Sequence, residues 1–96
     1  MGFLSVEFVK RHCFLVLKVE EPLQTMQRLM DLFATRKIIV ESLYMHPIEG
    51  GEAKIQIYCL IEKDRIQYNR QSMEKIRGIL EVQIMEKKDT NNLKTS

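Results

Sequence analysis

In two separated stretches of the sequence, every second residue is apolar. One runs from His12 to Glu20 and the other from Ala53 to Glu62. Successive side chains of a β-strand point to opposite faces of a sheet, so this period of two predicts strands with one fully apolar face. Such a face has to be covered by a second layer. The apolar positions are Cys13, Leu15, Leu17 and Val19, and then Ala53, Ile55, Ile57, Cys59 and Ile61.

A helical period follows the first strand. Apolar residues recur there at steps of three and four, which is typical of a helix packed by one face on a sheet. Pro22 suits the first turn of a helix, and the acidic Glu20 and Glu21 suit its positive end. A helix is therefore predicted from this point to about Lys37. Its predicted buried stripe is Leu23, Met26, Leu29, Met30 and Phe33.

The segment from Ile38 to His46 begins with β-branched residues and ends at Pro47, which predicts a second strand. Gly50-Gly51 tolerates positive φ, so this strand and Ala53 to Glu62 are predicted to form an antiparallel hairpin. A second helix and a last strand, Leu80 to Glu86, complete the pattern. The helix has Asp64 as its predicted N-cap, Ile66, Met73 and Ile76 as its periodic residues and Gly78 as its stop, and the strand has Leu80, Val82 and Ile84 facing inward.

This order predicts an α+β fold, the ferredoxin-like βαββαβ sandwich, with a four-stranded antiparallel sheet and both helices on one face. A length of 96 residues favours one domain, expected over residues 12–87. Residues 1–11 are interpreted as an N-terminal arm or an extra strand, because Phe3 to Val9 alternates in part. Residues 88–96 are polar and are predicted to form a disordered tail.

Composition and charge restrict the class of partner. A net charge of +2 predicts neither a nucleic-acid nor a membrane partner. The longest apolar runs are Cys13 to Leu17 and Ile57 to Ile61, far short of the roughly 20 residues that span a bilayer. With no signal peptide and two widely spaced cysteines, the chain is expected to be cytoplasmic with reduced thiols. The basic clusters Lys10-Arg11, Arg36-Lys37 and Lys87-Lys88 are interpreted as solubility charges.

Neither a catalytic nor a metal site is expected. His12 and Cys13 are adjacent on a strand and so point to opposite faces, and metal-binding spacings such as C-x-x-C are missing. Cys13 and Cys59 lie on the inward parity of their strands, which favours core packing over nucleophilic chemistry. The loop before Pro22 has no glycine and carries Glu20 and Glu21, which argues against an anion-binding enzyme loop. We therefore expect no catalytic residue, metal or cofactor.

Two stretches of sequence carry a family resemblance. LFATRKIIVESL and KIRGILEVQIME, within a match from Cys13 to about Lys88, resemble the ACT domain of acetolactate synthase small subunits. The one-domain length is most similar to the short, valine-insensitive isozyme II type. The resemblance implies a non-catalytic subunit that activates a large thiamine-diphosphate-dependent catalytic chain in branched-chain amino acid biosynthesis. It also implies homodimers in which two sheets join side by side. The predicted edge strand from Ile38 to His46 is consistent with this, because it has apolar residues on both parities and needs to be covered.

The resemblance also marks candidate effector positions. Where valine-sensitive members have an Asn, a loop Gly and a second-strand Asn, this chain has Glu21, Gln24 and Ile39. These replacements favour activation by protein contact over valine feedback. The alternative is a free-standing ACT-type module that senses another amino-acid-like ligand. An outward apolar patch is predicted on the helix-free face, formed by Phe14, Val16, Tyr58 and Leu60.

Overall fold

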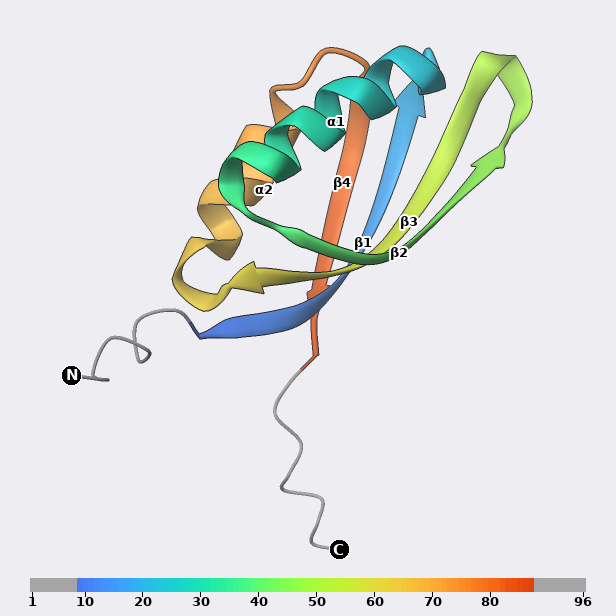
Figure 1. Ribbon diagram of the computed structural model, residues 1–96. Coiled ribbons are helices and arrows are strands. Elements are labelled where there is room, and N and C mark those ends of the chain that lie inside the picture. The colour runs from blue at the N-terminus through green and yellow to red at the C-terminus, as the bar shows by residue number, and fades with distance from the viewer. Residues whose placement is uncertain (1–8, 88–96) are drawn as a thin grey trace, which may run out of the picture.

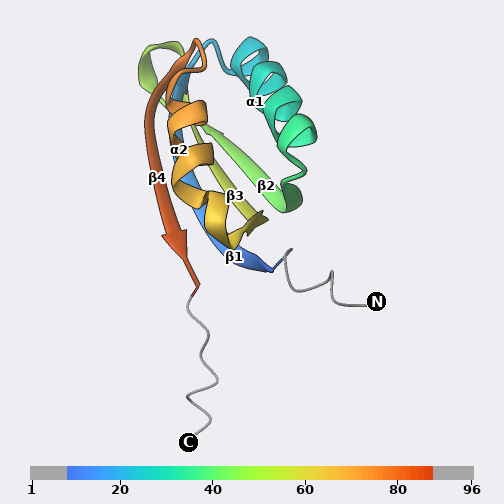
Figure 2. The same ribbon diagram turned by 90° about the vertical axis from the view of Figure 1, so that its left-hand side faces the viewer.

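The computed structural model describes residues 9–87, in which four strands and two α-helices follow the order β1-α1-β2-β3-α2-β4. The sheet is antiparallel with strand order β2-β3-β1-β4, and both helices cover one of its faces (Figures 1 and 2). The predicted ferredoxin-like fold is confirmed. The tail over residues 88–96 and all of the N-terminal segment before Val9 lie outside the described residues. The elements are β1 (Lys10–Glu20), α1 (Pro22–Arg36), β2 (Ile39–Pro47), β3 (Glu52–Glu62), α2 (Ile66–Glu74) and β4 (Ile79–Glu86).

The core lies between the helices and the two central strands. The inward residues of β1 and β3 are those predicted from the alternation, and all of them are buried. From α1, Leu29 and Phe33 pack on them, and Met73 does so from α2. Because β1 and β3 are each flanked by a strand on both sides, their inward side chains are shielded laterally as well as by the helices.

The predicted inward residues of the last strand are wrong at one position, because β4 contains a bulge. Lys18 pairs with Glu81 but Val19 pairs with Ile79, so Leu80 is an extra residue in β4. The bulge turns Ile79 toward the core, where it is partly buried, and leaves Leu80 46% exposed. The inward prediction holds for Val82 and Ile84, and it is wrong for Leu80.

Helix α1 begins at Pro22 as predicted, but its first turn differs from the expected pattern. Leu23 is 74% exposed, and the inward position is taken by Thr25, which is fully buried. The Thr25 hydroxyl donates to the carbonyl of Glu20 at 2.6 Å, which makes its burial possible. The N-cap residue Glu21 has φ 47° and makes no side-chain hydrogen bond to the helix. The prediction that Leu23 joins the buried stripe is therefore wrong.

Helix α2 is shorter than predicted. A 3-10 turn, η3 (Lys63–Arg65), precedes it, so its N-cap is Arg65 and the predicted cap by Asp64 is wrong. The helix ends at Glu74, and Gly78 lies beyond its C-cap, Lys75. A second 3-10 turn, η2 (Glu49–Gly51), closes the β2–β3 hairpin. Gly50 and Gly51 both have φ 78° there, as their sequence predicts.

Candidate functional site

The helix-free face of the sheet presents cross-strand rows of side chains. Phe14 on β1 pairs with Tyr58 on β3 and with Met85 on β4, while Ser42 on β2 pairs with Tyr58. This central row crosses all four strands. We call it, together with the apolar residues of the adjoining rows, the apolar face. Its members are Phe14, Val16, Ile39, Tyr44, Tyr58, Leu60 and Met85.

The centre of the apolar face is an aromatic pair. The rings of Phe14 and Tyr58 stack with centroids 4.5 Å apart and planes inclined by 27°. Tyr58 and Met85 are each 48% exposed when only the described residues are considered. The Tyr58 ring is therefore stacked on Phe14 on one side and still accessible to a partner. Stacked aromatic rings give a large, rigid contact surface at low entropic cost, which is typical of protein-binding surfaces.

A hollow of about 350 Å³ borders this row at the end where β1 begins. Phe14, Tyr58 and Met85 form its apolar part. His12 Nδ1 lies 3.3 Å from Glu41 Oε1 at its rim, and both side chains are about half exposed. Glu86 and Lys87 complete the rim. The hollow thus combines an aromatic wall with groups of both charges.

A second hollow, of about 290 Å³, lies on the same face near the β2–β3 turn. Val16 and Ile48 supply its apolar part, and Lys18, Lys54 and Glu81 supply charge. Its rim is more polar than the central row, because the neighbouring row pairs Lys18 with Lys54 and Glu81. The apolar face is therefore bounded by charged residues on this side.

The three candidate effector positions do not converge within one chain. Glu21 is the N-cap of α1, and Gln24 lies exposed in its first turn. Ile39 pairs with Leu60, whereas Glu20, next to Glu21, pairs with Glu52. Those two β3 positions are eight residues apart, which corresponds to roughly 25 Å along the strand. Ile39 instead shares a row with His12 at the first hollow.

The two thiols face the core and not the site. Cys13 and Cys59 pair directly across β1 and β3, and they are 3% and 0% exposed. Burial raises the pKa of Cys13 to about 11 and that of Cys59 to about 12. Each thiol therefore stays protonated at neutral pH, which removes the thiolate that nucleophilic chemistry requires.

Within residues 9–87, no group of three or more His, Cys, Asp or Glu side chains is placed to hold a metal ion. Across the same span, neither helix has the length and hydropathy that a bilayer crossing requires.

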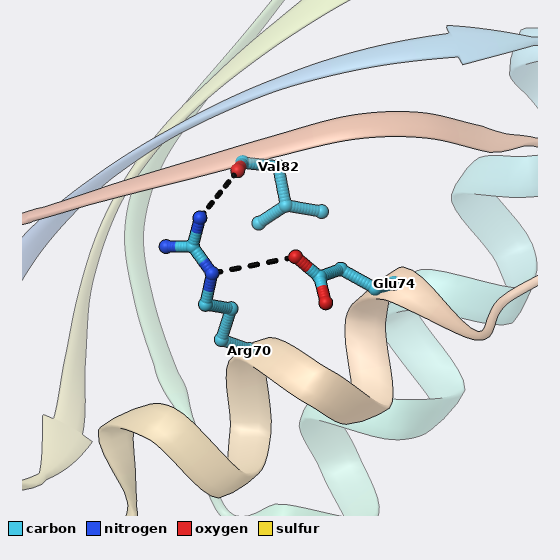
Figure 3. A network of polar contacts seen from close by, with 3 residues as sticks. All are labelled: Arg70, Glu74 and Val82. Atoms are coloured by element: carbon cyan, nitrogen blue, oxygen red, sulfur yellow. Dashed lines mark hydrogen bonds and ion pairs between the residues drawn. The ribbon is translucent and has the colours of Figure 1, made fainter.

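The two edges of the sheet differ. On β4, the carbonyl of Val82 accepts a hydrogen bond from Arg70 Nη2 at 3.1 Å (Figure 3). Among the described residues, no side chain donates to or accepts from the backbone of β2. Its ladder to β3 is interrupted by a bulge at Glu41, and it is regular again from Ser42 to Pro47. Among residues 9–87, β2 is therefore an edge strand whose backbone makes no side-chain hydrogen bond, and such an edge can pair with another strand.

Only part of this face could be recognised in the sequence. The outward positions predicted on β1 and β3 lie on the helix-free face, with Phe14 opposite Tyr58. Met85 and Tyr44 were missed, because the sequence does not show which strands flank the central pair. Met85 could have been predicted from its position in the last strand. It alternates with Val82 and Ile84, which were predicted to face inward, so it should face outward.

These elements and their pairing define a ferredoxin-like α+β domain. Solved structures of several other proteins share the fold. The ACT domain from GTP pyrophosphokinase of Chlorobium tepidum is 8% identical with a TM-score of 0.66, over 80% of this chain and all (100%) of that one. An uncharacterized protein from Thermotoga maritima is 20% identical with a TM-score of 0.66, over 83% and 100% of the two chains. The 30S ribosomal protein S6 from Thermotoga maritima is 13% identical with a TM-score of 0.64, over 91% and 96%.

At these identities the likeness extends to the fold alone, which is shared by ACT domains and by a ribosomal protein. No protein-family model matches the sequence, and no curated protein is similar to it.

Proposed function

We propose that this chain is a non-catalytic regulatory subunit that binds a catalytic protein through the apolar face of its sheet. The observation that carries the proposal is the row of Phe14, Tyr58 and Met85 on the side that the helices leave open, in which Phe14 is partly buried and Tyr58 and Met85 are each 48% exposed. Exposed apolar patches with a charged border are typical of protein-binding surfaces. The raised thiol pKa values, which argue against a nucleophile, are consistent with a non-catalytic role.

The catalytic partner we propose is the large subunit of acetolactate synthase. This choice rests on the resemblance of LFATRKIIVESL and KIRGILEVQIME to acetolactate synthase small subunits. LFATRKIIVESL covers the end of α1 and the first half of β2, and KIRGILEVQIME covers the α2–β4 connection and β4. Because Glu21, Gln24 and Ile39 replace the residues that hold valine in the family that the chain resembles, we propose activation by contact and not by valine.

The test is to purify the large subunit of the same organism and measure its acetolactate synthase activity with and without this chain. We expect the two proteins to co-elute and the activity to rise on mixing. Met85→Glu places a charge in the apolar face, so it should weaken the association at least tenfold while leaving the fold intact. Leu23→Glu is the matched control, because Leu23 is equally apolar and 74% exposed but lies on α1.

Association lost in Met85→Glu and kept in Leu23→Glu supports the proposed face. If the wild-type chain neither associates with the large subunit nor changes its activity, the proposed partner is wrong. If both variants bind as the wild type does, the partner stands but the apolar face is not the contact. Circular dichroism on each variant confirms that the fold is retained.

One observation favours a second candidate function, the sensing of an amino-acid-like ligand. The hollow beside Phe14 and Tyr58 is about 350 Å³, within the range of small-molecule sites. Its rim carries His12 and Lys87 for a carboxylate, and Glu41 and Glu86 for an ammonium group. Thermal-shift screening of the standard amino acids tests this candidate. A hit that Glu41→Gln abolishes supports it, and no hit at millimolar concentration contradicts it.

A further inference from the structure

A basic hollow lies at the end of the sheet opposite the β1–α1 loop. It has a volume of about 550 Å³. Its lining residues come from the start of β1, the end of α1, the end of β3 and the start of α2, and Figure 1 shows these segments near one another. These segments are far apart in the sequence, so no local sequence motif predicts the site. Lys10 and the pair Arg36-Lys37, interpreted separately as solubility charges, meet here.

The charges around the hollow are strongly unbalanced. Lys10, Arg36, Lys37 and Arg65 line it, and Glu62 is the one carboxylate among its lining residues. The local surplus of three positive charges exceeds the formal net charge of the whole chain, which is +2. Among the described residues, none of these four cations has a carboxylate within 4.0 Å. Clustered like charges of this kind attract a multiply charged anion.

The two guanidinium groups are held in place by one aromatic ring. The Cζ atom of Arg36 lies 4.4 Å from the ring centroid of Tyr68, and that of Arg65 lies 5.1 Å from it. Cation–π attraction to the shared ring offsets part of their mutual repulsion. Both guanidinium groups therefore contact the same ring, and neither is neutralised by it.

Arg36 has a second anchor inside the protein. Its Nη1 donates to Asn69 Oδ1 at 2.9 Å, and Asn69 is only 3% exposed. A guanidinium has five N–H donors, so this bond fixes its orientation and leaves other donors for a ligand. Nearby, Lys10 Nζ donates to the carbonyl of Lys37 at 3.2 Å, which ties the start of β1 to the end of α1. The donors are thus positioned before any ligand arrives.

We propose that the basic hollow binds a phosphate-bearing small molecule. Planar guanidinium groups bind phosphate oxygens through paired hydrogen bonds, and two of them, from Arg36 and Arg65, line this hollow. A phosphate group carries more charge than a single carboxylate, so it is better matched to a surplus of three positive charges. The volume lies within the range of small-molecule sites, which favours a compact ligand over a nucleic acid strand.

The test uses inorganic phosphate and pyrophosphate as probes on the purified full-length chain. Isothermal titration calorimetry and the ³¹P line width of the probe report binding directly, with acetate as a carboxylate comparison. Arg65→Gln removes one guanidinium and leaves the Arg36–Asn69 hydrogen bond in place. Arg36→Gln removes the other. Arg77→Gln is the control, since Arg77 is exposed at the opposite end of α2 and the change in charge is identical.

We expect saturable binding of pyrophosphate that weakens about tenfold or more in Arg65→Gln and in Arg36→Gln, because each loses a charged hydrogen-bond donor. Arg77→Gln should bind as the wild type does. The proposal is overturned if neither probe binds at millimolar concentration, if acetate binds equally well, or if Arg77→Gln weakens binding as much as Arg65→Gln. The assay needs no protein partner, so its outcome is independent of the proposed regulatory function.

Discussion

At the scale of single residues, Gly78 and Thr25 show how a close contact fixes residue identity. Gly78 has φ 99°, and a Cβ atom at this position would overlap the Thr25 hydroxyl. The Gly78 carbonyl accepts a hydrogen bond from the Glu20 amide at 2.8 Å. Thr25 itself donates to the Glu20 carbonyl. The α2–β4 connection is thereby locked to the β1–α1 loop, and only glycine fits both the conformation and the space.

Gly78→Ala should lower the free energy of unfolding by about 2 kcal/mol or more, because backbone strain and overlap with Thr25 act together. Urea unfolding followed by circular dichroism measures this. The control is Gly51→Ala, which also has positive φ but has no atom within 4 Å of the added Cβ. Its cost should be only about 1 kcal/mol, from the backbone alone. Equal costs for the two variants would contradict the close-contact explanation.

The paired thiols make a second residue-scale prediction, concerning alkaline pH. Burial raises the pKa of Cys13 to about 11 and that of Cys59 to about 12, from an ordinary value of 9.0. Above pH 9 the unfolded chain releases these protons first, so it binds fewer protons than the folded chain. The stabilisation is therefore complete below pH 9 and is lost as the pH rises toward 11 and 12.

We expect the free energy of unfolding, measured in urea, to fall more steeply between about pH 9 and pH 11 in the wild type than in Cys59→Ala. The alanine variant is less stable at every pH because it leaves a cavity, so the comparison concerns the slope and not the absolute value. The two proteins differ only at residue 59, so contributions that they share cancel in this comparison. Parallel slopes would show that the Cys59 thiol does not contribute.

At the scale of elements, the two edge strands of the sheet differ in whether a side chain bonds to their backbone. Arg70 reaches from α2 to the carbonyl of Val82 on β4 and also pairs with Glu74 at 3.3 Å (Figure 3). The contact holds α2 on the edge strand, and it occupies a backbone group that another strand would need. The other edge strand, β2, is interrupted by its bulge at Glu41 but has a regular ladder beyond it.

Arg70→Met keeps most of the side-chain length but removes both contacts, so it should lower the free energy of unfolding by about 1 to 2 kcal/mol. Glu74→Gln is the control, because it removes only a half-exposed ion pair one helical turn away. That pair is worth at most about 0.5 kcal/mol. Thermal and urea unfolding of the two variants check the difference. If Glu74→Gln costs as much as Arg70→Met, the carbonyl contact contributes little.

At the scale of the whole molecule, the three surfaces described above lie in different places. The apolar face is on the helix-free side, the open β2 edge is at one side of the sheet, and the basic hollow is at the end opposite the β1–α1 loop. One chain therefore has room for a protein partner, a second copy of itself and a small anion. The basic hollow can therefore be tested with variants that leave the apolar face and the β2 edge unchanged, whereas Tyr44 belongs to both the apolar face and β2.

We expect the chain to form a homodimer in which the β2 strands pair across the segment from Ser42 to Pro47. Size-exclusion chromatography with light scattering should give twice the monomer mass of 11.4 kDa. Tyr44 is 54% exposed on this strand, and Tyr44→Lys should shift the protein toward monomer, because a lysine opposes edge-to-edge pairing. Leu23→Lys, on α1, should remain dimeric. A monomeric wild type contradicts the prediction.

The sequence alone determined the order of the elements, the inward faces of β1 and β3 and the positive-φ hairpin turn, because these depend on local periodicity and local backbone preference. The prediction for Leu80 is wrong because a bulge in the pairing of β4 with β1 overrides local periodicity. The prediction for Leu23 is wrong because Thr25, bonded to the Glu20 carbonyl, takes the buried position. The alignment of Phe14 with Tyr58 and Met85 and the meeting of Arg36 with Arg65 at Tyr68 were likewise decided by tertiary structure. Each of these surface sites is formed by residues that are far apart in the sequence, and only the folded chain brings such residues together.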